Sequence, residues 1–111
     1  MVFDLEAALK GMGDDKSLLQ ETLGDFIEFY GDAGAKLRTA LDEGRYDNVE
    51  IMAHTLKGLG GTFAAPALRA SALTLEKAMH AGELDDASQK VADLEAAVDA
   101  MVADIRVVLN G

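Results

Sequence analysis

Cysteine and tryptophan are absent from the 111-residue chain, proline occurs once, and aromatic residues make up only 5% of it. Without cysteine, neither a disulfide framework nor a thiolate metal site can form, which is compatible with a reducing compartment. The scarcity of aromatic residues and proline favours helices over strands. A chain of this length with 50% hydrophobic residues can build one core and is too short for two. We therefore expect a single domain over residues 1–111.

Long apolar runs and an excess of basic residues are also lacking. No run approaches the roughly 20 apolar residues of a membrane-spanning helix. The N-terminal sequence MVFDLEAALK has no basic region followed by an apolar one. The formal net charge of −10 repels nucleic-acid phosphates and anionic lipid alike. These features predict a soluble, cytoplasmic protein with neither nucleic acid nor membrane among its partners.

Apolar residues recur at helical spacing, in alternating steps of four and three, along most of the chain. Two long series predict helices over about 15–43 and about 85–109. Shorter helices are expected between them, over about 47–63 and 66–81, and a short helix over about 3–10 precedes them all. Because the connections are short, successive helices should run antiparallel. The predicted fold is all-α: an up-and-down antiparallel four-helix bundle with a short N-terminal capping helix.

Residues that start, end or bend helices agree with these bounds. Asp14 or Asp15 can cap the first long helix and Gly44 can end it, with a bend at Gly31 and Gly34. The other predicted boundary residues are the Asp47 and Glu50 capping box, Pro66 in a first turn, Gly82 at a helix end, and Asp85 or Asp86 as a cap.

The segment AHTLKGLGG, residues 53–61, is unusual because three glycines follow a histidine and a lysine inside a predicted helix. Glycine costs roughly 1 kcal/mol relative to alanine in a helix interior. These glycines must therefore serve either close packing or access to the surface.

Helical geometry divides this segment into two faces. With Val49 at zero and about 100° per residue, His54 and Gly58 fall at about 140° and 180°, nearly opposite the core. Lys57 and Gly61 fall on the same side, at about 80° and 120°. The residues that define the core face are Met52, Leu56, Leu59 and Phe63. His54 therefore stands on a surface cleared of side chains, and the glycines beside it are predicted to provide access.

His54 has neighbours suited to chemistry, although a lone exposed histidine is most often an ordinary surface residue. An imidazole titrates near pH ~6.5, so at neutral pH it is mostly the free base and can attack an electrophilic phosphorus. Lys57, three residues on, would offset negative charge carried on the ring. The pattern indicates a nucleophile that a large partner must reach.

The motif in residues 53–58 matches that of a known family. A small residue followed by His-x-Leu-Lys-Gly appears here as AHTLKG, and the next helix contains the expected Leu-Glu at Leu75 and Glu76. In these features, and along almost the whole chain, the sequence resembles the histidine-containing phosphotransfer (Hpt) domains of multistep two-component phosphorelays. Leu59 and Ala64 depart from the family's pattern, which often has serine or alanine at the first and glycine at the second. We expect Ala64 to tighten a helix contact near the site.

The resemblance implies that His54 accepts a phosphoryl group from the aspartate of one receiver domain and passes it reversibly to another. A hybrid sensor histidine kinase would stand upstream. Glu76 would hydrogen-bond the inner ring nitrogen and fix the tautomer, so that the outer nitrogen is free to attack. A solvated Glu76 paired with Lys77 or Arg69 is the alternative. Lys57 would stabilise the charge of the phosphoryl group.

The resemblance also implies a docking surface for response-regulator receiver domains. Gly58 and Gly61 would form its flat centre, and exposed apolar groups such as Ile51 and Leu73 would extend it. The protein is expected to be a monomeric phosphocarrier with no ATP site and no cofactor of its own. The Mg²⁺ that phosphoryl transfer requires would come from the receiver.

Other functions fit the sequence less well. A histidine-kinase dimerisation helix would carry an acidic residue and a proline where Thr55 and Gly58 stand. No phosphate-binding glycine-rich loop is present, and His54 and His80 lie on different helices without metal-ligand spacing. His80 is interpreted as a favourable charge at a helix end, without chemistry. The alternative function is an acidic interaction or carrier bundle without phosphotransfer, for which Ser17 is a poor attachment site.

Overall fold

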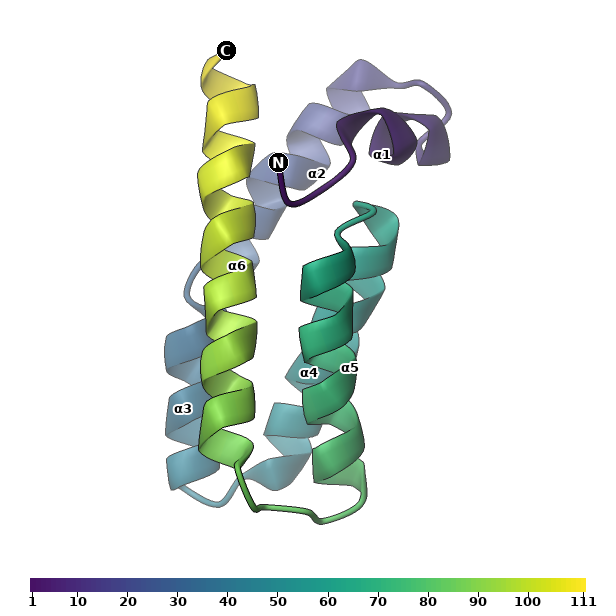
Figure 1. Cartoon of the computed structure of the whole chain (residues 1–111). Helices are drawn as coiled ribbons and strands as arrows, with labels where there is room; N and C mark the ends of the chain where they lie inside the picture. Colours follow the sequence, from purple (N-terminus) through teal and green to yellow (C-terminus); the bar gives the residue numbers. More distant parts are fainter.

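The computed structural model describes all 111 residues and contains six α-helices and no strands (Figure 1). The helices are α1 Leu5–Gly11, α2 Lys16–Tyr30, α3 Ala33–Asp42, α4 Tyr46–Thr62, α5 Pro66–His80 and α6 Ala87–Asn110. Helices α3 to α6 run alternately down and up beside one another, while α2 leads into α3 at an angle and α1 packs on α2. The predicted all-α bundle with a short N-terminal helix is confirmed.

One apolar core joins the helices. Of the 27 buried residues, 25 are hydrophobic, and the other two are Gly34 and Gly60. The predicted core residues Leu56 and Phe63 are fully buried, and Phe63 meets Phe26 of α2 edge to face with ring centroids 5.8 Å apart. The other two predicted core residues of α4, half-buried against this cluster, are Met52 and Leu59. Since α4 is anchored along this face, its opposite face is the one that reaches solvent.

The predicted helix over 15–43 is wrong as a single element, because the chain breaks into α2 and α3 at Gly31 and Asp32. Asp32 leaves the helical region with a ψ of 18°, and α3 begins after it. The apolar stripe continues across the break, which is why the spacing alone indicated one helix. Gly34 is not a bend: it is buried within α3, and a Cβ there would meet the Glu95 side chain of α6, which would have to move aside.

Several predicted boundary residues are confirmed. Asp15 caps α2 by accepting a hydrogen bond from the N–H of Leu18 at 3.0 Å, and Pro66 occupies the first turn of α5. Gly44 and Gly82 follow α3 and α5 with φ of +74° and +70°, in the left-handed region that favours glycine. These residues set the short connections that keep the bundle helices antiparallel.

The predicted capping box of Asp47 and Glu50 is wrong. Helix α4 begins one residue before Asp47, with Arg45 at the N-cap and no side-chain capping bond. Glu50 does not fold back on the helix start, because its carboxylate accepts a hydrogen bond from His80 of α5. Asp86 is the N-cap of α6, as expected, but its side chain makes no capping bond either.

Ala64 lies outside α4, in the turn to α5. Its φ is +52°, a conformation that glycine adopts readily and that costs alanine about 1 kcal/mol. The Ala64 carbonyl accepts a hydrogen bond from the N–H of Asp4 at 3.0 Å, so this turn also holds the N-terminal segment. The departure from glycine therefore strains a turn and does not tighten a helix contact.

Candidate functional site

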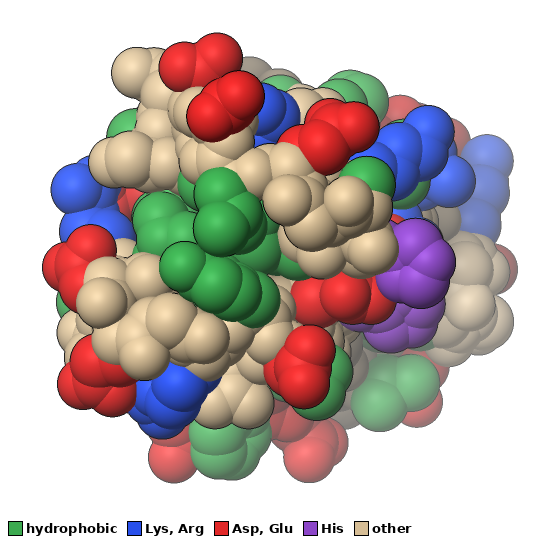
Figure 2. Space-filling model, turned by 90° about the horizontal axis from the view of Figure 1, so that it is seen from below, with side chains coloured by type: hydrophobic (Ala, Val, Ile, Leu, Met, Phe, Trp, Pro, Cys, Tyr) green, Lys and Arg blue, Asp and Glu red, His purple; other side chains and the backbone are tan.

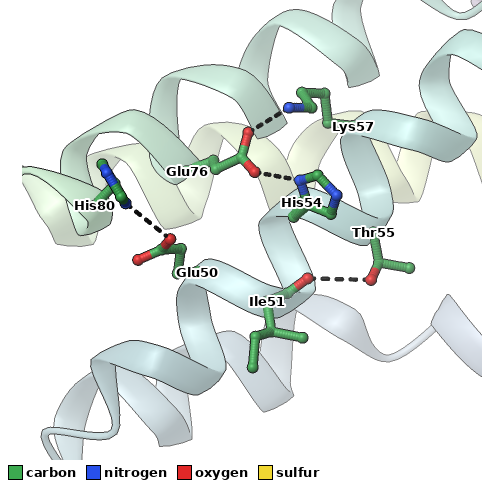
Figure 3. Close-up of polar contacts among 7 residues, drawn as sticks. All are labelled: Glu50, Ile51, His54, Thr55, Lys57, Glu76 and His80. Atoms are coloured by element: carbon green, nitrogen blue, oxygen red, sulfur yellow. Dashed lines mark hydrogen bonds and ion pairs between the residues drawn. The ribbon is translucent and has the colours of Figure 1, made fainter.

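His54 lies on the solvent side of α4, and its side chain is 68% exposed. Its Nδ1–H donates a hydrogen bond to Oε2 of Glu76 on α5 (Figure 3). An ionised carboxylate has no proton to give, so Nδ1 carries the shared proton, and in the neutral form of the ring it is the one protonated nitrogen. The outer nitrogen, Nε2, therefore keeps its lone pair, as a nucleophile requires.

Glu76 connects His54 to Lys57. Each of its carboxylate oxygens has one partner: Oε2 accepts from His54, and Oε1 accepts from the Lys57 ammonium at 2.6 Å. The hydrogen bond from Lys57 lowers the pKa of Glu76 below the usual range, partial burial opposes this, and the hydrogen bond from His54 lowers the pKa further. Glu76 is thus ionised at neutral pH. Its partner is neither Lys77 nor Arg69, the alternatives that the sequence left open.

Lys57 is held by the same carboxylate as His54. Its side chain is 26% exposed, and its ammonium points to Glu76 on the neighbouring helix (Figure 3). The sequence placed Lys57 on the same side as His54, but no local pattern indicated that a glutamate of α5 would bind it. Lys57 and His54 are therefore linked through the carboxylate that they share.

The three glycines of α4 serve two different purposes. A Cβ added to Gly58 or Gly61 would meet nothing within 4 Å, so both leave open surface near His54. A Cβ on Gly60 would lie 2.7 Å from the backbone nitrogen of Arg69 and 2.8 Å from its Cα. Gly60 therefore lets α4 and α5 approach closely, and this contact brings His54 within reach of Glu76. The packing role of Gly60 could have been predicted from the sequence, because helical spacing puts this residue on the buried face of α4.

The two apolar residues predicted for docking lie on different helices. Ile51 is 64% exposed on α4, three residues before His54, and lines a groove between α3 and α4 together with Thr55. Leu73 is half-buried on α5, three residues before Glu76, and does not line that groove. The structure thus does not join Ile51 and Leu73 in one depression.

A second histidine–glutamate pair lies beside the first. His80, the last residue of α5, donates a hydrogen bond through Nδ1 to Oε2 of Glu50 on α4 at 3.2 Å (Figure 3). The sequence gave no chemistry to His80, and Glu50 was predicted to cap a helix. Seen along the bundle in Figure 2, histidine side chains project from one side of the molecule, beside acidic side chains.

No group of three or more histidine, cysteine, aspartate or glutamate residues is arranged to hold a metal ion. None of the six helices combines the length and the apolar character needed to cross a membrane. What α4 and α5 do present is an exposed imidazole oriented by a carboxylate.

Comparison with known proteins identifies the family. The family model of the Hpt domain matches residues 21–105, a segment that includes His54, Lys57 and Glu76. Neither a curated protein nor a solved structure shows a significant match to the chain. Hpt domains are phosphocarriers that perform histidine phosphotransfer in phosphorelays, and they interact with response-regulator receiver domains. The match spans most of the chain, which therefore belongs to the Hpt domain family.

Proposed function

We propose that this Hpt domain accepts a phosphoryl group on Nε2 of His54 from the aspartyl phosphate of one receiver domain and passes it reversibly to another. The observation that carries the proposal is the orientation of the exposed ring. Its inner nitrogen is bound by an ionised carboxylate, while the outer nitrogen has a lone pair available for attack.

The transfer can be followed atom by atom. The Nε2 lone pair of His54 attacks phosphorus, the bond between phosphorus and the aspartate oxygen breaks, and the aspartate leaves as a carboxylate. The proton on Nδ1 remains on the ring, which gains positive charge as the N–P bond forms. The Glu76 carboxylate hydrogen-bonded to Nδ1 stabilises this charge. Lys57 holds Glu76 in place, so both are assigned supporting roles.

The partner must bring a protein surface up to His54. Open space over Gly58 and Gly61 would admit it, and the exposed Ile51 of α4 and the half-buried Leu73 of α5 would each provide apolar contact. The Mg²⁺ used in phosphoryl transfer would be held by the receiver. A hybrid sensor histidine kinase would supply the phosphoryl groups, since the Hpt domain is proposed to have no kinase activity of its own.

We place this phosphocarrier in the cytoplasm and expect it to be a monomer. The absence of cysteine fits a reducing compartment. The apolar faces of the bundle helices cover one another in a single core, so that a second copy is not needed to bury them.

The test is phosphoryl acceptance by the wild-type protein and by His54→Gln. A phosphorylated receiver should label the wild type with acid-labile phosphate and leave the variant unlabelled. His54→Gln should keep its helical circular dichroism spectrum, because the exposed ring leaves no cavity when it is replaced. An unlabelled wild type would favour the alternative, an acidic interaction or carrier bundle without phosphotransfer. Label retained on the variant would refute the assignment of His54.

A further inference from the structure

Two segments with the same spacing face each other across α4 and α5. In each of them, Glu50–His54 (EIMAH) and Glu76–His80 (EKAMH), a glutamate stands four residues before a histidine. Because the helices are antiparallel neighbours, each glutamate binds the histidine of the other helix (Figure 3). The result is two crossed pairs, and the proposed function uses only one of them.

Glu50 is also a neighbour of His54 on its own helix. Side chains four residues apart on a helix lie on the same face, with about 5–6 Å between their Cβ atoms, and a glutamate and a histidine at this spacing can meet. His54 therefore has two glutamates within reach: Glu76 across the helix interface and Glu50 one turn away. In the structure the Glu50 carboxylate turns from His54 to His80 (Figure 3).

A Glu50 carboxylate without this partner would compete with Glu76 for His54. If it accepted a hydrogen bond from Nε2, the ring would take the other tautomer, and Nε2 would lose the lone pair that attacks phosphorus. Its negative charge would also repel the incoming phosphoryl group. Both effects would slow transfer without changing the fold.

We propose that His80 is a positioning residue that holds Glu50 away from His54, so that Glu76 alone sets the tautomer of the nucleophile. The inference rests on the proposed function of His54. It assigns a role to the Glu50–His80 pair, which the motif around His54 does not contain.

The experiment first removes the His80 side chain that binds Glu50 and then also removes the charge of Glu50. His80→Ala should let the Glu50 carboxylate reach His54, and the double variant His80→Ala/Glu50→Gln should abolish that effect. The His80 side chain is 82% exposed at the end of α5, so its removal should leave the fold intact, as circular dichroism would verify. Asp47→Asn in the His80→Ala background is the matched control, because it removes a carboxylate from the same helix one turn further from His54.

Two measurements at one neutral pH report the outcome. The ¹⁵N chemical shifts of the His54 imidazole give the tautomer in the unphosphorylated protein, and labelling by a phosphorylated receiver gives the initial rate of acceptance. We expect His80→Ala to populate the Nε2–H tautomer and to slow acceptance about two-fold, the size of one side-chain contact at this helix spacing. Glu50→Gln should restore both values, whereas Asp47→Asn should restore neither.

Two results would overturn the proposal. One is a His80→Ala protein with the wild-type tautomer and rate. The other is a slowed variant that Glu50→Gln does not rescue, since His80 would then act by another route. Failure of the proposed function would look different: the wild type would take up no phosphoryl group, while the His54 tautomer would still respond to the variants.

Discussion

Replacing Gly60 with alanine should destabilise the bundle, whereas the same change at Gly58 should stabilise it. Both glycines lie in α4, two residues apart. At Gly60 the new methyl group would lie 2.7 Å and 2.8 Å from backbone atoms of Arg69, so the backbone of α5 would have to move. At Gly58 a methyl group would have nothing within 4 Å.

The magnitudes follow from two opposing effects. Alanine gains about 1 kcal/mol over glycine in a helix interior, and at Gly58 nothing opposes this gain. Forcing a methyl group into a packed interface costs about 1–3 kcal/mol, and Gly60 belongs near the upper end because backbone must shift. Gly60→Ala should therefore lower the free energy of unfolding by about 2 kcal/mol, which makes this variant about 3 kcal/mol less stable than Gly58→Ala. For a domain of this size the two melting temperatures should differ by on the order of 10 °C.

Thermal and urea unfolding followed by circular dichroism would measure these changes. Gly24→Ala is the control, because Gly24 lies inside α2 with open space around its Cβ position and should behave like Gly58. A Gly60→Ala protein as stable as Gly58→Ala would refute the view that close helix approach requires the glycine. Gly58→Ala should also accept phosphoryl groups more slowly despite its higher stability, and an unchanged rate would contradict the access role of this glycine.

Three further outcomes are expected. Lys57→Ala should slow transfer or shorten the phosphohistidine lifetime without abolishing acceptance, because the lysine stabilises charge and is not the nucleophile; unchanged rates in both directions and an unchanged lifetime would contradict this. Glu76→Gln should lower the free energy of unfolding in urea at neutral pH and have less effect in acid. The folded-state pKa of Glu76 is lowered, so its stabilisation is present above the usual glutamate range and is lost as the pH falls through that lowered pKa; a difference independent of pH would count against the pair. Ala64→Gly should raise stability by about 1 kcal/mol in thermal unfolding, by relieving the positive φ; a lower melting temperature would mean that contacts of the methyl group outweigh the strain.

The exposed face of α4 could be predicted from the sequence because it depends on a local period. Leu56 and Phe63 repeat at helical spacing and are buried, so His54 had to lie on the other side. The partner of Lys57 could not be predicted in this way. The pairing of Lys57 with Glu76 depends on the position of α5 along α4. The close contact at Gly60 fixes that position, and no local sequence pattern predicts it.

The local rules failed where tertiary contacts or backbone geometry overruled them. Glu50 fits a capping box by spacing, but His80 on the next helix binds its carboxylate. Ala64 was expected to tighten a helix contact, but it lies past the end of α4 in a turn with positive φ, which helical spacing does not predict. The break after Gly31 was hidden because the apolar stripe does not stop there.

The hydrogen bond between His54 and Glu76 uses the inner ring nitrogen, so it need not break when a group is attached to the outer one. The helices that carry these two residues are fixed by a core that the attached group does not touch. We therefore expect the loaded and empty forms to share one conformation, so that a partner can tell them apart only by contact with the ring. On this view the signal is carried by the phosphoryl group itself and not by a change of conformation. The rate of signalling would then depend on how often the partner proteins collide with this domain.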